Sequence, residues 1–241
     1  MNDHVLFGVL PYFGMVAFIL GSVVRISTAP PVAAAAGGHG AGRQVRILAF
    51  CVIALAAGHL VLLAAPDAVL RWNRSMARLL LAEGVGIWLG ALSLLVVAQS
   101  LWRRLTDSSA RPQPVGDVMA STLLGMEIAT GLLLAVLYRW ASSWSVVTLT
   151  PYAVSVLKLG PRVELVTATP FLVRLHVFCA YAILVVLPFT TVGSLVLAIV
   201  RRFVLPMLAP LAPAHRSALS SIAARTSRNL GVLGTWHEEE N

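Results

Sequence analysis

Five long apolar runs, almost free of charge, determine what this chain can fold into. A helix that crosses the hydrocarbon of a bilayer needs about 20 consecutive and mostly apolar residues. Runs of this kind cover residues 5–26, 45–65, 79–102, 117–138 and 169–200. The chain as a whole is 58% hydrophobic and only 12% charged, whereas about a quarter of the residues of a soluble domain are charged. We therefore predict an all-α polytopic membrane protein, a bundle of five transmembrane helices.

The segments between and after the runs differ in composition. The stretch STAPPVAAAAGGHGAGR, before the second run, is typical of a flexible loop. Residues 140–167 are long and mixed, and they fit either a surface helix or extended structure. We expect residues 1–202 to form the transmembrane domain and residues 203–241 to form a C-terminal arm, which either docks on a partner or is disordered. The N-terminus lacks a basic start and a small-residue cleavage site, so we expect the first helix to remain in the protein.

The net charge of +8 comes almost entirely from arginine. Because the arginines flank the apolar runs, they indicate membrane topology and anionic lipid rather than nucleic acid. The side that holds the C-terminus carries eleven basic residues and the other side seven. The rule that cytoplasmic loops are richer in Lys and Arg therefore predicts a cell (inner) membrane protein with its N-terminus outside and its C-terminus in the cytoplasm.

Two histidines lie inside apolar runs at matching depth. His59 is in the second run and His176 is in the fifth, which crosses the membrane in the opposite direction. Each is about 10 Å below the same membrane surface. One imidazole on each face of an iron is the arrangement of a bis-histidine haem, and an intramembrane histidine is a candidate functional site. The alternative is that each histidine is a packing residue, hydrogen-bonded to a neighbouring helix.

Other residues near this depth fit a haem. Gly58 would let a flat macrocycle approach the second helix, and Arg174 is placed to pair with a propionate. Glu127 lies near the middle of the fourth run, where a charged carboxylate costs about 2.5–3.5 kcal/mol. It is expected to be protonated or paired. It then serves either as a proton-relay group near a quinone or haem, or as a hydrogen bond that locks two helices together.

A family resemblance emerges from the order and spacing of short elements. These are Pro11-Tyr12, Gly21-Ser22 and Arg25 in the first run, Gly58-His59 and Pro66 in and after the second, Asp117 and Gly131 in the fourth, and Arg174-Leu175-His176 and Pro188-Phe189 in the fifth. Together they resemble the haem-b membrane subunit, or gamma subunit, of respiratory nitrate reductase over residues 9–200.

The resemblance implies five spans and two b haems. It also implies oxidation of quinol near the outer face and electron transfer to an iron–sulfur subunit and a molybdenum catalytic subunit. His59 and His176 match the ligands of the outer haem. The positions of the second ligand pair hold Ala49 and Ser194, which cannot ligate iron, so we predict one haem b.

The family also places a lysine near its quinol site and a glutamine at a position held here by Glu127. The nearest basic residues to that lysine are Arg78 and Arg74. With Glu127, they are the candidates for quinone or proton binding.

The leading hypothesis is therefore an electron-transfer subunit of a quinol-dependent, nitrate-reductase-like oxidoreductase, with no molybdenum site on this chain. An alternative is a haem-free membrane anchor for a soluble oxidoreductase. A third possibility, a small transporter that uses Glu127, is disfavoured because the sequence shows no inverted repeat. The terminal substrate and the direction of electron flow stay open.

Overall fold

The computed structural model describes residues 3–28, 39–106, 115–190, 193 and 197. This part of the chain is mostly helical and contains no strand. Five helices are long and apolar enough to cross a membrane: Val5–Arg25, Arg43–Ala64, Met76–Arg103, Val115–Leu137 and Phe171–Phe189. The prediction of an all-α bundle of five spans is confirmed. The arm expected over 203–241 lies outside the described residues.

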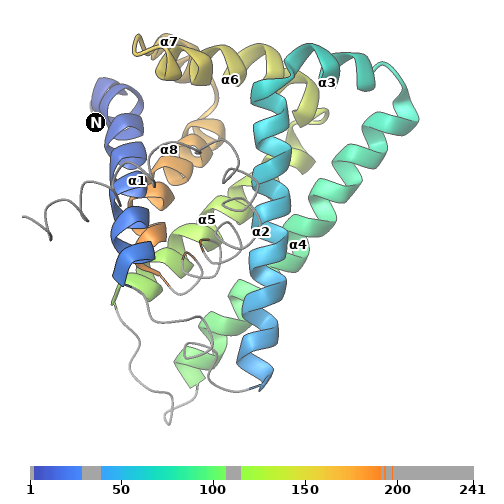
Figure 1. Cartoon of the computed structure of the whole chain (residues 1–241). Helices are drawn as coiled ribbons and strands as arrows, with labels where there is room; N and C mark the ends of the chain where they lie inside the picture. The colour runs from blue at the N-terminus through green and yellow to red at the C-terminus, as the bar shows by residue number, and fades with distance from the viewer. Residues whose placement is uncertain (1–2, 29–38, 107–114, 191–192, 194–196, 198–241) are drawn as a thin grey trace, which may run out of the picture. The chain divides into compact units, whose positions relative to one another are not determined.

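The long helices are joined by shorter ones (Figure 1). The first span is a π-helix, Val5–Val9, that continues into α1 (Leu10–Thr28). The other spans are α2 (His39–Ala64), α4 (Met76–Thr106), α5 (Val115–Leu137) and α8 (Phe171–Val186). The shorter helices are α3 (Pro66–Trp72), α6 (Ala141–Leu157) and α7 (Glu164–Thr167), with a 3₁₀ turn over Leu187–Phe189.

Two spans differ in length from the prediction. Helix α2 already begins at His39, inside the segment expected to be a loop. The run expected over 169–200 is not one continuous α-helix, because α8 ends at Val186 and a 3₁₀ turn follows. Pro188 lies in that turn, and Thr190 is extended, with φ −112° and ψ 161°. Proline has no N–H to donate to the preceding turn, which explains why the α-helix ends there.

The open question over residues 140–167 is answered by two helices, α6 and α7. Helix α6 packs against α2, α3, α4 and α7. It lies at the end of the bundle where α2 and α5 end and α4 and α8 begin, together with α3 and α7 (Figure 1). We call this the α6 end.

The apolar core of the α6 end surrounds Tyr152. The buried residues are Phe7, Tyr152, Val156, Val163 and Val166. The Tyr152 hydroxyl donates to the Phe7 carbonyl at 2.8 Å, and the Tyr12 hydroxyl donates to the Val156 carbonyl at 3.1 Å. Burial, reinforced by Tyr181, raises the pKa of Tyr152, so its phenol stays a donor. These bonds tie α6 to the start of the first span.

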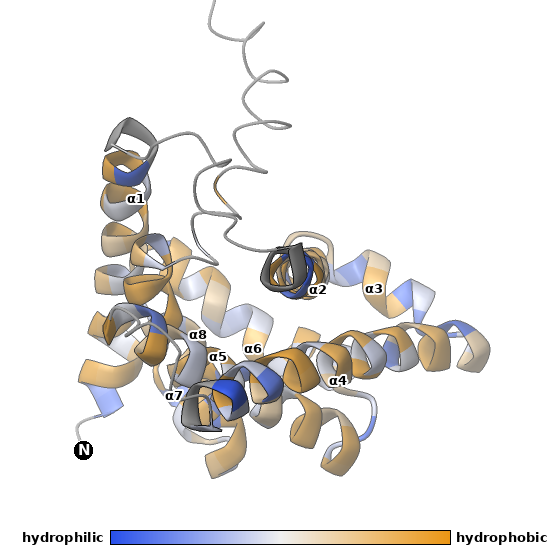
Figure 2. Ribbon diagram, turned by 90° about the horizontal axis from the view of Figure 1, so that it is seen from below, coloured by the Kyte–Doolittle hydropathy of each residue, from blue (hydrophilic) through white to orange (hydrophobic). Residues whose placement is uncertain are grey.

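Helix α2 stands apart from part of the bundle. It packs against α3, α4 and α6, whereas α8 packs against α1 and α5. Figure 2 shows α2 end-on beside α3 and α4 and at a distance from α1. All residues from Ala56 to Val61 are exposed, which means that no part of the helix circumference is covered there. Residues 56–61 of α2 are therefore not covered by any other helix of the described chain.

Candidate functional site

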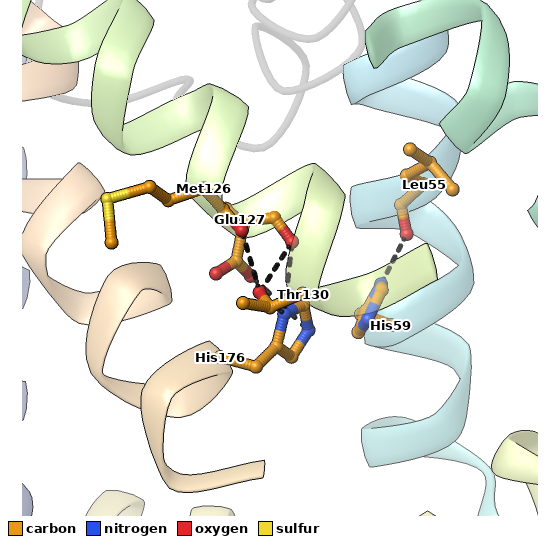
Figure 3. Close-up of polar contacts among 6 residues, drawn as sticks. All are labelled: Leu55, His59, Met126, Glu127, Thr130 and His176. Atoms are coloured by element: carbon orange, nitrogen blue, oxygen red, sulfur yellow. Dashed lines mark hydrogen bonds and ion pairs between the residues drawn. The ribbon is translucent and has the colours of Figure 1, made fainter. Parts of the chain in front are cut away.

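The two intramembrane histidines lie side by side. His59 is five residues before the end of α2, and His176 is five residues after the start of α8. Because these ends lie at the same end of the bundle, both histidines are about 8 Å from it. Their ring centroids are 6.2 Å apart and the ring planes are inclined at 39°. Figure 3 shows the pair, with side chains of α5 around His176.

The hydrogen bonds of His176 define its tautomer. Its Nδ1 lies 3.0 Å from Thr130 Oγ1 and 3.2 Å from the Glu127 carbonyl oxygen. A carbonyl only accepts, so Nδ1 carries the proton and donates. The Thr130 hydroxyl in turn donates to the Met126 carbonyl at 2.8 Å, which leaves its oxygen free to accept from His176. In the neutral ring, Nε2 therefore presents a lone pair.

His59 has the same tautomer for the same reason. Its Nδ1 lies 2.8 Å from the Leu55 carbonyl oxygen, one turn earlier in α2. Nδ1 therefore donates, and Nε2 carries a lone pair. The two neighbouring rings come from different helices, and in its neutral form each presents an unprotonated Nε2, the form in which imidazole ligates a metal.

Glu127 contacts the histidine pair directly. Its Oε1 lies 3.4 Å from His176 Nε2, and the two side chains are 19% and 15% exposed. Its Oε2 is buried without a hydrogen-bond partner among the described residues. The contact between Glu127 and His176 joins α5 to α8, which fits a helix-locking role. It also places a carboxyl group beside the histidine pair, where a proton-relay group would lie.

The remaining sequence-predicted residues lie at different distances from the pair. A Cβ built on Gly58 meets nothing within 4 Å, in keeping with the open space along α2. Arg174 Nε is buried and has no hydrogen-bond partner in the described part of the chain. Arg74 and Arg78 are exposed near the start of α4, where the Arg78 guanidinium lies 5.2 Å from the centre of the Trp72 ring. No hydrogen bond among the described residues connects either arginine with the histidines.

A comparison with known families decides the identity of the fold. The family described as the nitrate reductase gamma subunit matches residues 3–205. The chain belongs to the nitrate reductase gamma subunit family. A search of curated proteins finds no match. The protein is therefore a multi-pass membrane protein of a family whose members are subunits of nitrate reductase, an oxidoreductase complex.

Two residues that position His176 in this gamma-family chain were not assigned a role from sequence. Thr130, only 6% exposed, accepts the Nδ1–H bond, and Gly131 gives the ring room. A Cβ on Gly131 would lie 3.1 Å from His176 Cε1. Both follow Glu127 by three or four residues and so share its helix face. That spacing is the signal that could have identified them.

A polar network at the α6 end was also missed. Glu83 Oε1, on α4, accepts from the backbone N–H of Ser142 at 2.8 Å and from its hydroxyl at 2.6 Å. Asn73 Nδ2 donates to the hydroxyls of Ser142 and Ser143, at 3.1 and 3.0 Å. The network joins the α3–α4 turn to the start of α6 and satisfies an amide that the helix itself leaves without a partner.

Proposed function

We propose that this chain is the membrane cytochrome b subunit of a nitrate-reductase-like complex, with one haem b held between His59 and His176. The observation that carries the proposal is the pair of imidazoles from two helices whose ring centres lie 6.2 Å apart, each with its Nδ1 next to a backbone carbonyl. Within the described residues, no group of three or more His, Cys, Asp or Glu side chains is placed to hold a metal ion. A haem needs only two protein ligands, because its macrocycle supplies the other four nitrogens.

The ring separation fits two imidazoles that would hold one iron between them. Two imidazoles that each bound a metal through nitrogen at about 2.0 Å would have their ring centres roughly 6 Å apart. The observed centroid distance is 6.2 Å. The exposed segment 56–61 and the unobstructed Gly58 leave space on the α2 side. Nε of Arg174 is buried and has no hydrogen-bond partner in the described chain. This nitrogen is therefore available to donate to a haem propionate.

One contact favours the alternative, a haem-free membrane anchor. Glu127 Oε1 lies close to the same Nε2 atom that would ligate the iron. Without a haem, the contact between the carboxyl and the imidazole holds α5 against α8. Binding of a haem iron by Nε2 of His176 would require the Glu127 carboxyl to leave this nitrogen.

When bound, the haem would supply one-electron redox chemistry, and the protein supplies ligation, orientation and electrostatics. Thr130 and the Glu127 carbonyl hold the His176 ring in its ligating tautomer. We propose that the Glu127 carboxyl accepts a proton released by quinol, and that Arg78 and Arg74 are the candidates to contact the quinone headgroup. Electrons pass between the quinone pool and an iron–sulfur and molybdenum partner, which holds the oxyanion-reducing site.

We further propose that a single haem is bound, in the membrane half nearer the α6 end. Ala49, at one position of the family's second ligand pair, is 0% exposed and has only a methyl group to offer. Its counterpart Ser194 lies outside the described residues. We place the chain in the cell (inner) membrane with its N-terminus outside and its C-terminus in the cytoplasm, as the distribution of arginines predicts.

A quinol-reduction experiment tests this function. The purified chain is mixed with a reduced, water-soluble quinol analogue, and the b-type absorption band is followed. We expect the wild-type chain to be reduced, and His59→Ala and His176→Ala to lack the band. A chain that folds and carries no haem would support the anchor. A haem that quinol does not reduce would remove the quinone from the proposal.

A further inference from the structure

The turn between α6 and α7 holds a leucine in a backbone conformation that leucine rarely adopts. The Leu159 N–H donates to the Val156 carbonyl at 3.0 Å. The Gly160 N–H donates to the Ser155 carbonyl, also at 3.0 Å. These are the two bonds of a Schellman motif, whose left-handed position is usually a glycine. Here Leu159 occupies that position, with φ 60°, although its Cβ makes left-handed backbone unfavourable.

Ser155 fixes this turn from the inside. Its side chain is buried, and its hydroxyl donates to the Tyr152 carbonyl at 2.6 Å and accepts from the Arg162 N–H at 2.9 Å. A sparsely populated backbone conformation persists where the surroundings determine it, and such positions often serve a function. The consequence here is that the side chain of Leu159 is 80% exposed.

The turn lies beside the first span, near the point where the apolar stretch of that span begins. The span starts at Val5, and the Tyr12 hydroxyl, two turns further on, donates to the Val156 carbonyl just before the turn. Just after the turn, the Val163 side chain packs against Gly8, on which a Cβ would lie 3.5 Å from Val163 Cγ2. Figure 1 shows α7 close to the start of the first span. The turn is therefore level with the first turns of a membrane span.

The surroundings of the turn are apolar, with basic side chains at the edge. We call Leu157 and Leu159, which are 59% and 80% exposed, the apolar tip. Helix α6 has no charged residue, whereas a helix with one face in water typically carries charges there. The charged side chains next to the tip are the exposed Lys158, Arg162 and Glu164, so that two cations outnumber one anion. This pattern fits the boundary between hydrocarbon and headgroups.

We propose that the apolar tip inserts Leu157 and Leu159 into the bilayer at the α6 end, while Lys158 and Arg162 reach the phosphate groups of phospholipids. Long basic side chains can keep their methylene groups in apolar surroundings and their charge among headgroups. Val9, 59% exposed on the first span, lies at the same level, so the tip continues a surface that already faces lipid. Transfer of an exposed leucine from water to hydrocarbon offsets its unfavourable backbone. The insertion is independent of haem and quinone.

Spin labels in nanodiscs test where the tip lies. The full chain carries one nitroxide at Leu159→Cys, in nanodiscs of phosphatidylcholine and phosphatidylglycerol with one chain each. Its collisions with oxygen and with a water-soluble nickel chelate are measured by EPR. The reference labels are at Val9→Cys, in the first span, and at Glu164→Cys, exposed on α7. Cys51 and Cys179 are buried, and the unsubstituted chain serves as the labelling blank.

We expect the ratio of oxygen to nickel collisions at Leu159→Cys to match that at Val9→Cys and to exceed that at Glu164→Cys at least about threefold. Frequent nickel collisions at Leu159→Cys would place the tip in water and overturn the proposal. Rare collisions with both reagents would show that protein covers the tip, and spin–spin broadening in nanodiscs with two chains would identify a second copy. Either result would overturn insertion into lipid.

A second set of variants tests the side chains with the label moved to Leu157→Cys. Leu159→Asn suits left-handed backbone better than leucine but removes the apolar side chain. We expect it to lower the oxygen-to-nickel ratio at least about twofold, whereas Val147→Asn, at another exposed apolar residue of α6, should leave the ratio unchanged. Lys158→Glu with Arg162→Glu should lower the ratio as well, because phosphates repel the new carboxylates. An unchanged ratio in Leu159→Asn would overturn the insertion, and one in the double variant would overturn the phosphate contacts.

Discussion

The Thr130 hydroxyl on α5 lies 3.0 Å from Nδ1 of His176 on α8. This contact crosses a helix interface, fixes the plane of the imidazole and keeps its proton on the nitrogen that faces away from the proposed iron. Partners of this kind typically contribute a factor of about 10–100 in metal affinity.

Replacement of the hydroxyl by a methyl group should therefore loosen the proposed ligand. We expect Thr130→Val to lower haem affinity about tenfold, measured by titrating haem into the haem-free chain. Thr148 is a matched control, because its hydroxyl donates to the Trp144 carbonyl of its own helix. Thr148→Val should bind haem like wild type, and equal affinities in the two variants would contradict the role of Thr130.

A side chain at Gly131 should shift the His176 ring. A Cβ there would lie 3.1 Å from His176 Cε1, so Gly131→Ala must displace the ring. We expect weaker haem binding, by about tenfold. Gly86→Ala is the control, since its Cβ would meet nothing within 4 Å and alanine favours a helix over glycine by up to about 1 kcal/mol. Haem titration and thermal unfolding of both variants check this. Wild-type affinity in Gly131→Ala would show that the ring has more room than the structure gives it.

The proposed proton role of Glu127 predicts a kinetic effect without a loss of haem. Glu127→Gln keeps the size of the side chain but removes its ability to accept a proton. We expect the haem content to be unchanged and haem reduction by quinol to slow by about 100-fold, a typical contribution of general acid–base catalysis. Glu83→Gln is the control, because Glu83 Oε1 bonds to Ser142 instead of the histidine site. An unchanged rate in Glu127→Gln would leave this residue only the role of joining α5 to α8.

The network around Glu83 should contribute to stability and not to chemistry. Removal of the carboxylate in Glu83→Ala leaves the N–H of Ser142 without its partner. We expect a loss of about 1–3 kcal/mol in the free energy of unfolding. Glu164→Ala, which changes an exposed carboxylate on α7, should cost about 0.5 kcal/mol or less. Thermal unfolding in detergent measures both, and equal stability of the two variants would show that the network is dispensable.

The sequence predicted the spans and the level of the two histidines well, for a physical reason. A bilayer demands about 20 apolar residues per crossing, so hydropathy alone locates the helices, and the fixed rise of a helix places His59 and His176 at one depth. The break after Val186 was harder to predict, because the apolar run continues past Pro188.

The neighbours of the histidines could not be predicted in the same way. Thr130 and Gly131 depend on how α5 is rotated against α8, and hydropathy contains no information about this rotation. Likewise, Glu83 and Ser142 are far apart in sequence and meet only because α6 folds back over α4. The helical state of residues 140–167 depended on the same packing, since their pattern fitted helix and extended structure equally.

The most direct test of the haem site is the haem content of the purified chain, measured as pyridine haemochrome per polypeptide with His59→Ala and His176→Ala in parallel. We expect about one haem b per wild-type chain and none in either variant. Two haems per chain, or a haem retained in both variants, would contradict the single site between His59 and His176.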